Sequence, residues 1–284
     1  MQNDIEKVIA AIDYIEAHLS EKLDLEIVAE AVHYSKYYLH RIFTRTAGLT
    51  IHDYVQRRQL TEAAKLLVFS DRPITEIARI AGYESQQAFT SAFKTMYKKS
   101  PGQYRDKEEF YPLQLKYVLT RHPVVSDIDW KQEIRFAKAE DIPKWLDLVR
   151  MVVDGFSCLE EEQYREQLQK YIRDNRALIL TDGELAVGAM GFTPETGSID
   201  FFGVHPQYRK RGIAQAFLQK AFSLLTDGTE ISVTTFREGD KADPGYRDVF
   251  KQLGFAEAEL LVEYGYPTQR FVLPMNDPED TADE

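Results

Sequence analysis

The sequence has little that could support covalent cross-links or insertion into a membrane. Cys158 is the only cysteine in 284 residues, which excludes an intramolecular disulfide framework and fits a reducing compartment. No apolar run approaches the ~18 residues that a membrane span needs, so we expect no membrane contact. The first residues, MQNDIEKVIAAIDYIEAHLSEK, carry acids and lack an uninterrupted apolar core, which argues against a signal peptide. We therefore expect a cytoplasmic protein.

Positive charge is scarce overall but concentrated in one segment. The chain holds 35 Lys+Arg against 46 Asp+Glu, a formal net charge of −11. Residues 33–105 nevertheless hold 12 basic against 5 acidic residues, whereas the first 32 residues hold 2 against 8. A basic block within an acidic chain is the electrostatic footprint of a nucleic-acid binder. Chance clustering of solvated charge is the alternative.

Glycine and proline are absent from residues 50–69, and this segment joins two similar segments. Residues 25–48 and 74–101 each have the pattern of a short helix, a tight turn and a longer helix, which is the helix-turn-helix pattern. Tyr34 matches Tyr83 at an offset of 49, and Ser35 matches Ser85 at an offset of 50, because the second turn has one more residue. Residues 3–18 also have helical spacing. We expect 50–69 to form a rigid helical spacer.

The longer helix of each copy has one apolar face and one polar face. The outward positions are Lys36, Tyr37, His40, Arg41, Thr44 and Arg45 in the first copy, and Ser85, Gln86, Gln87, Thr90, Ser91 and Lys94 in the second. Arg suits guanine and Gln suits adenine in the major groove, while cations hold phosphates. If the spacer separates the helices by one DNA turn (~34 Å), one chain reads two successive major-groove segments. A helical bundle used for protein contacts is the alternative.

These segments carry a resemblance to a known family. YSKYYLHRIFTRTAG, RRQLTEAAKLL, ITEIARIAGYESQQAFTSAFK and SPGQYR resemble the AraC/XylS transcription regulators over residues 5–105, and most closely the monomeric branch related to MarA, SoxS and Rob. The resemblance implies bacterial origin, an all-α double helix-turn-helix and promoter DNA as partner, and it leaves contact with RNA polymerase open. It places the base-reading positions on Tyr37, His40 and Arg41, and on Gln86, Gln87, Thr90 and Ser91.

Two positions depart from that family's pattern. His33 stands where the first turn often has Gly, and His is among the residues that tolerate a left-handed turn. Ser91 stands where an Arg is common in the closest branch, which affects the preferred DNA sequence rather than DNA binding itself.

After residue 106 the helical period stops and a different pattern follows. We predict a DNA-binding domain over 1–106, a linker over 107–130 with one strand in LQLKYVLT, an α/β domain over 131–275 and an acidic tail over 276–284. Strands alternate with helices in the α/β domain, which indicates a mixed central sheet. ALILTDGELAVGAMGFT predicts a β-hairpin, and Gly203 in the following strand predicts a bulge.

A second basic run, HPQYRKRGIA, lies between a predicted strand and a predicted helix. Gly212 at the turn lets backbone N–H groups approach an anion, and the helix N-terminus adds partial positive charge. Three neighbouring cations add charge at the rim: Arg209, Lys210 and Arg211. We therefore expect a pyrophosphate held by the backbone N–H groups of Gly212, Ile213 and Ala214. A solvated loop with random charge is the alternative.

This stretch, continued as VHPQYRKRGIAQAFLQKAF, resembles the GNAT superfamily of acyl-CoA-dependent N-acetyltransferases over about residues 132–275. Arg209, Gly212 and Ala214 meet the family's cofactor pattern. The resemblance implies acetyl-CoA as cofactor and an unknown amine as acceptor or effector. It also implies that a splayed strand contacts the pantetheine arm through Phe202, Gly203 and Val204.

The resemblance also suggests catalytic residues. In the family a carboxylate takes the amine proton and a Tyr protonates the leaving thiolate. Asp200 is the candidate base. The usual Tyr position holds Phe250, and Tyr246, one turn earlier on the same helix face, is the candidate acid. The histidines have no metal-ligand spacing, so we expect no metal.

Three functions remain open from the sequence. The second domain either senses acyl-CoA or another ligand for the regulator, or catalyses N-acetylation of a small amine or peptide. In the third reading, a DNA-bound acetyltransferase modifies chromosomal or polymerase proteins. Cys158 is expected to be a packed thiol rather than a nucleophile.

Overall fold

The computed structural model describes residues 2–107, 109–120, 129–152, 161–226, 228–263 and 265–273. Cys158, part of the predicted linker and the predicted acidic tail lie outside these residues. The chain forms two compact units. The first comprises Met1–Ile128, Leu146–Tyr164 and His205–Arg209, and the second comprises Asp129–Trp145, Arg165–Val204 and Lys210–Glu284.

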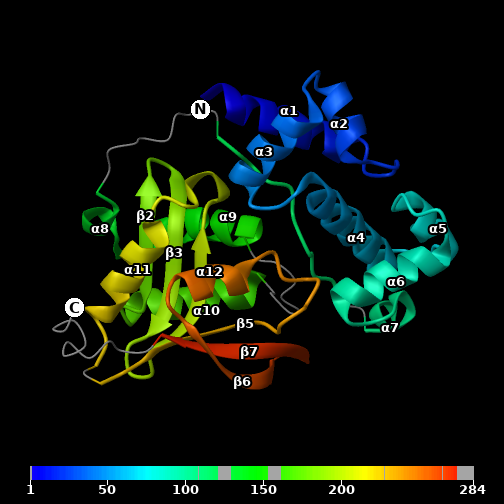
Figure 1. Cartoon of the computed structure of the whole chain (residues 1–284). Coiled ribbons are helices and arrows are strands. Elements are labelled where there is room, and N and C mark those ends of the chain that lie inside the picture. The colour runs from blue at the N-terminus through cyan, green and yellow to red at the C-terminus, as the bar shows by residue number, and fades with distance from the viewer. Residues whose placement is uncertain are drawn as a thin grey trace, which may run out of the picture. The chain divides into compact units, whose positions relative to one another are not determined.

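The first unit contains the predicted double helix-turn-helix. Its helices are α1 (Gln2–Ala17), α2 (Leu25–Ala31), α3 (Lys36–Ala47), α4 (Ile51–Phe69), α5 (Ile74–Ile80), α6 (Gln86–Tyr97) and α7 (Pro101–Arg105) (Figure 1). The two copies have equal lengths, because α2 and α5 have 7 residues each and α3 and α6 have 12 each. The prediction of an all-α N-terminal fold with an internal repeat is confirmed.

The two turns use the same backbone conformation with different residues. Ser35 and Ser85 cap α3 and α6, since their hydroxyls accept hydrogen bonds from Tyr38 N and Ala88 N. His33 has a φ of 59° and Gly82, its counterpart in the repeat, has a φ of 77°. Both lie in the left-handed region, where Gly is the default residue. Because this turn requires a positive φ, a residue other than Gly at position 33 must tolerate that conformation, as His33 does.

The spacer between the two copies is one long helix. α4 has 19 residues, which corresponds to a length of about 28 Å at 1.5 Å per residue. It is buried on several sides, and even the polar side chains of Arg57, Arg58 and Thr61 are inaccessible. The predicted rigid connection is therefore present.

Aromatic side chains of α6 and α7 complete the second copy. The rings of Phe93 and Tyr97 are stacked, with their centres 4.4 Å apart.

The segment after α7 differs from the expected linker strand, since residues 109–120 form no strand. We call these residues the strap. Its backbone bonds to side chains rather than to another strand: Leu113 N and Gln114 N donate to the Thr61 hydroxyl at 3.0 and 3.2 Å. Tyr111, Leu113 and Tyr117 are buried. The alternation that suggested a strand therefore reflects one side of an extended chain packed on helices.

The second unit is built on one sheet of seven strands. The strands are β1 (Arg135–Phe136), β2 (Ala177–Asp182), β3 (Leu185–Thr193), β4 (Ser198–Val204), β5 (Ile231–Phe236), β6 (Ala256–Glu263) and β7 (Tyr266–Leu273). Their order in the sheet is β1-β2-β3-β4-β5-β7-β6. Among the strand pairs of the described residues only β4–β5 is parallel, so the predicted mixed α/β sheet is confirmed.

Helices complete the α/β part of the chain. They are α8 (Trp130–Glu133), α9 (Ile142–Val152), α10 (Glu161–Arg173), α11 (Ile213–Phe222) and α12 (Tyr246–Gln252), with 3-10 turns at Ala139–Asp141 and Pro206–Tyr208. A side chain at Gly188 would meet Phe217 of α11 at 2.7 Å, and one at Gly191 would meet Tyr171 of α10 at 3.1 Å. Since strand residues three apart face opposite sides, α11 and α10 cover opposite faces of the sheet.

The bulge in β4 lies earlier than predicted. Gly203 pairs regularly with Ala189, whereas the register shifts where Gly191 and Phe192 face Phe201 and Ile199. Asp200 is therefore the extra residue. Gly203 did not locate the bulge, because a bulge is defined by a residue without a cross-strand partner rather than by the lack of a side chain.

Candidate functional site

The polar faces of α3 and α6 are exposed as the sequence predicted. Of the residues singled out, Thr44 on α3 and Thr90 on α6 are half-buried and the others are exposed: Lys36, Tyr37, His40, Arg41 and Arg45 on α3, and Ser85, Gln86, Gln87, Ser91 and Lys94 on or next to α6. Tyr37 is 81% exposed, which is unusual for a large aromatic residue and suits contact with a partner. The opposite faces, including Phe43 and Phe93, are fully buried.

The two exposed faces differ in charge. The α3 face carries cations, and two of them are already paired: Arg45 Nη2 lies 2.7 Å from Asp4 Oδ2, and Lys36 Nζ lies 3.5 Å from Glu26 Oε1. The α6 face is mostly uncharged. Sequence reasoning passed over Ala88, which is exposed beside Gln87. An exposed methyl group at such a position is suited to contact with a thymine methyl group.

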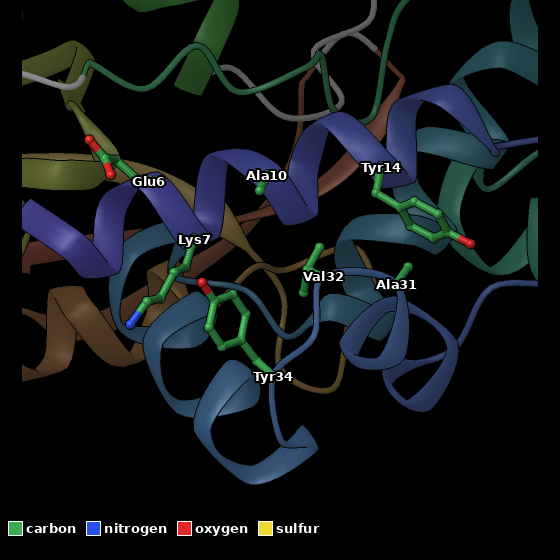
Figure 2. A pocket seen from close by; sticks show the side chains of 7 residues that line it. All are labelled: Glu6, Lys7, Ala10, Tyr14, Ala31, Val32 and Tyr34. Atoms are coloured by element: carbon green, nitrogen blue, oxygen red, sulfur yellow. The ribbon is translucent and has the colours of Figure 1, made fainter.

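A shallow cleft of about 390 Å³ lies between α1 and the first turn. Its lining is Glu6, Lys7, Ala10, Tyr14, Ala31, Val32 and Tyr34. Figure 2 shows the Lys7 side chain lying alongside the Tyr34 ring. Lys7 Nζ is 5.0 Å from the centre of that ring and 4.8 Å from the centre of the Tyr38 ring, so the ammonium group interacts with both.

In the second unit, β4 and β5 separate at their carboxyl ends. They pair only through Ser198 with Ser232 and Ile199 with Val233. Beyond these rows β4 continues to pair with β3, and β5 continues to pair with β7 up to Phe236. The facing edges of the two strands are thus not paired with each other beyond these rows. Phe202, Gly203 and Val204, the predicted pantetheine contacts, lie on this part of β4.

The N-terminus of α11 has the properties expected of an anion site. Gly212 is the N-cap residue with a φ of 78°, and no side chain caps the helix. The first N–H groups of a helix have no partner within it, and they carry partial positive charge. A side chain built at Gly212 would point into open space. The cradle expected for Gly212, Ile213 and Ala214 is therefore geometrically available, and it fits a phosphate group.

Lys210 and Arg211 lie beside Gly212 in the second unit. Lys210 has a φ of 60°, so the turn contains a non-glycine residue in the left-handed region as well as Gly212. In the first unit, burial together with the charge of Arg209 lowers the pKa of His205 to about 4. His205 is therefore neutral at pH 7.

Asp200, the candidate base, is the centre of a polar cluster. Its Oδ2 accepts hydrogen bonds from Tyr171 at 3.0 Å and Thr193 at 3.1 Å, and its Oδ1 accepts from Ser198 at 3.2 Å. Arg176 Nη2 lies 3.5 Å away. Partial burial, together with the Asp200 charge, raises the pKa of Tyr171. No sequence signal pointed to these partners, which come from α10, β3 and the loop between α10 and β2.

Tyr246, the candidate acid, begins α12 and is half-buried. Its ring centre lies 6.5 Å from that of Phe236, the last residue of β5, so it stands at the end where β5 leaves β4. Phe250 packs against Phe255 at 5.4 Å and Phe271 at 6.4 Å. Phe250, which stands at the position where the resemblance expects a Tyr, therefore packs against other aromatic side chains here. The catalytic roles of Tyr246 and Asp200 remain predictions.

Comparison with known proteins finds relatives for both halves. The family model described as a helix-turn-helix domain matches residues 28–107, and the one described as an acetyltransferase (GNAT) domain matches residues 148–264. The regulatory protein SoxS of Escherichia coli K12 is 38% identical over 96 residues, which are 34% of this chain and 90% of SoxS. An uncharacterized regulator of Bacillus subtilis, YbfP, is 40% identical over 94 residues, which are 33% of this chain and 32% of YbfP.

The second half is similar to a solved GNAT acetyltransferase of Bacillus cereus. The two share 17% identity with a TM-score of 0.38, over 49% of this chain and 94% of that structure. The two family models define the class, a helix-turn-helix DNA-binding regulator joined to a GNAT domain. The chain belongs to the AraC-type family of regulators, as SoxS does. It spans about a third of the length of YbfP. Within the described part of the chain, no helix is long and apolar enough to cross a bilayer.

Proposed function

We propose that this protein is a bacterial transcription regulator that reads two successive major-groove segments of promoter DNA with α3 and α6, and whose GNAT domain binds acyl-CoA as a signal. One observation carries the DNA-reading proposal. Two helices of equal length, each in the same turn geometry, expose polar side chains on one face and bury aromatic side chains on the other. Promoter DNA as target also supports action in the cytoplasm.

The two exposed faces predict different roles for individual side chains. Replacing Gln87 by Ala removes a side chain suited to adenine, so we expect about tenfold weaker binding and relaxed preference at one base pair. Replacing Lys94 by Ala removes a phosphate contact, so we expect weaker binding to all sequences and a salt dependence reduced by about one charge. The measurement is binding of both variants to a duplex selected by the wild-type protein from a random pool, at several salt concentrations.

The selection itself tests the proposal. If the wild-type protein enriches no duplex over the starting pool, sequence-specific DNA reading is wrong. Lys65→Ala on α4 is a control with the same loss of charge outside the two recognition helices, and its binding should equal that of the wild-type protein.

The acyl-CoA proposal rests on the separated edges of β4 and β5 and on the uncapped N-terminus of α11. The β4 edge at Phe202–Val204 would hold the pantetheine arm through backbone hydrogen bonds, while Gly212, Ile213 and Ala214 would hold the pyrophosphate with Arg209, Lys210 and Arg211 at the rim. When bound, the cofactor supplies an activated thioester, acetyl-CoA being our specific proposal. Used as a signal, it would change DNA affinity by its differential affinity for two states of the protein.

A second candidate function, N-acetyltransferase activity, is favoured by the same site together with Tyr246 at the end of β5. We expect thiol release from acetyl-CoA with one member of a panel of amines, polyamines, aminoglycosides and peptides. Replacing Tyr246 by Phe removes the proposed acid, so turnover should fall on the order of a hundredfold. Tyr266→Phe is a matched control, because the Tyr266 ring contacts the same Phe236 at 5.9 Å.

The outcomes separate the two candidates. If no amine releases thiol while acetyl-CoA changes DNA affinity, the domain is a sensor. If thiol is released and Tyr246→Phe leaves the rate unchanged, Tyr246 is not the acid. If acetyl-CoA neither binds nor alters DNA affinity, both roles of the GNAT domain are wrong.

A further inference from the structure

Helix α1 contacts the exposed side of α3 through a charged network. Asp4 uses both carboxylate oxygens for α3: Oδ1 accepts from the Tyr38 hydroxyl at 2.6 Å, and Oδ2 accepts from Arg45 Nη2 at 2.7 Å. One turn along α1, Lys7 Nζ donates to the same Tyr38 hydroxyl at 2.9 Å. The hydroxyl thus accepts from an ammonium group and donates to a carboxylate, and both of its roles are satisfied by α1.

The Tyr38 ring also contacts a cation from α3 itself, Arg41. The guanidinium carbon of Arg41 lies 5.6 Å from the centre of the Tyr38 ring, within the range of a cation–π contact. Lys7 lies 4.8 Å from the same ring, and Figure 2 shows it between α1 and Tyr34. Hydrogen bonds from Tyr38 and Arg45 hold the pKa of the Asp4 carboxyl below its ordinary value. The carboxylate is therefore charged at neutral pH.

The network constrains two arginines that would otherwise be mobile. A long side chain loses rotamer entropy when it becomes ordered. Arg45 donates to Asp4 through Nη2 only, which leaves the rest of its five-donor fork for another acceptor. Arg41 rests on the Tyr38 ring. Both arginines are held on the exposed face before any ligand arrives.

The internal repeat provides a comparison within the chain. At the offset of 50 residues, Tyr38, Arg41 and Arg45 correspond to Ala88, Ser91 and Thr95. All three network residues of α3 are thus replaced in α6, while the buried positions stay aromatic, as at Phe43 and Phe93. Tyr38 and Arg45, which bond to α1, and Arg41, which rests on Tyr38, are thus all replaced in the second copy. This pattern indicates that the network is dedicated to α3 rather than part of the common helix-turn-helix scaffold.

We propose that Asp4 and Lys7 are positioning residues for DNA recognition, which fix Arg41 and Arg45 of α3 in the orientation that contacts the bases. The inference rests on the DNA-reading function proposed above. α1 thereby contributes to sequence specificity through α3, and the energy of ordering the two arginines is supplied at folding rather than at binding.

The test replaces Asp4 by Asn and measures binding to the duplex selected by the wild-type protein and to a scrambled duplex of equal length. Glu6→Gln is the matched control, because it removes the same charge from an exposed side chain of α1. We expect Asp4→Asn to bind the selected duplex about tenfold more weakly and the scrambled duplex unchanged, with the salt dependence unaltered. Glu6→Gln should match the wild-type protein in both assays.

A second variant isolates the hydroxyl. Tyr38→Phe keeps the ring under Arg41 and removes only the group that joins Lys7 to Asp4, so the same loss of discrimination is expected. Circular dichroism melting confirms that each variant is folded at the assay temperature.

Two results would overturn the proposal. If Asp4→Asn strengthens binding to both duplexes and steepens the salt dependence, Asp4 merely competes with phosphate for Arg45. If the ratio of the two affinities is unchanged, the network is structural only. Both results presuppose that the wild-type protein selects a duplex, so they differ from a failure of the proposed DNA-reading function.

Discussion

Replacing Arg58 by Ala is expected to lower the free energy of unfolding of the first unit by about 3–5 kcal/mol, the usual range for breaking a buried ion pair. Arg58 lies inside the bundle with only 7% of its side chain exposed, and its partner Glu16 on α1 is 14% exposed. Nε and Nη2 donate to the two Glu16 oxygens at 2.8 Å each, and Nη1 donates to Gln114 O of the strap at 3.0 Å. The truncation would leave a buried carboxylate and a buried carbonyl without these donors.

A matched control is available on the surface. Arg72 forms an i,i+4 ion pair with Glu76 and is about half exposed, so Arg72→Ala should cost under about 1 kcal/mol. Urea unfolding followed by far-UV circular dichroism measures both losses. The double variant Arg58→Met with Glu16→Leu should recover much of the loss, because the carboxylate that loses its partner, Glu62, is 43% exposed and remains hydrated. A loss below about 1 kcal/mol for Arg58→Ala would show that the pair is not buried in solution.

Replacing Gly212 by Glu is expected to weaken acetyl-CoA binding on the order of a hundredfold. A carboxylate at the α11 N-terminus would repel the pyrophosphate, and a unit charge about 5 Å away at an effective dielectric of 20 contributes roughly 3 kcal/mol. The left-handed φ of 78° adds a strain of about 1–2 kcal/mol for any side chain. The shift in melting temperature on adding acetyl-CoA measures the binding.

Gly183→Glu separates strain from repulsion. Gly183 also has a positive φ, 58°, and open space in place of a side chain, but it lies in the turn between β2 and β3. This control should lose similar stability and keep its response to acetyl-CoA. Raising the salt concentration should partly restore binding to Gly212→Glu, because screening weakens repulsion. Equal binding by the wild-type protein and Gly212→Glu would rule out this helix N-terminus as the pyrophosphate site.

Much of the first unit could be predicted because its determinants are local. The match between Tyr34 and Tyr83 and the serine caps at Ser35 and Ser85 are visible in the sequence, and helical periodicity gives the buried faces directly. The left-handed turn at His33 was also recognisable, since its counterpart in the repeat is Gly82. The network of Asp4 with Arg45 was not, because it joins residues 41 positions apart through a helix packing angle that no periodicity encodes.

The second unit was predictable in the order of its elements but not in their register. Strand alternation cannot locate a bulge, so Asp200 was missed as the extra residue of β4 in favour of Gly203. The separation of β4 from β5 likewise depends on which strand each edge pairs with, a long-range property. The N-terminus of α11 was easier to predict, because Gly212 after a basic run is a local signal for a turn that leads into a helix.

The strap has a consequence for any transfer of the helix-turn-helix unit to another protein. Tyr111 accepts hydrogen bonds at its carbonyl from both Tyr97 and Tyr104, and the Thr61 hydroxyl accepts from Leu113 N and Gln114 N. A reading frame cut after residue 106 would discard this packing and uncover aromatic side chains. Recombination that moved this DNA-reading module to another partner domain would therefore need its crossover downstream of Tyr117. The helix-turn-helix family model ends at residue 107, but the segment that packs with these helices extends to Tyr117.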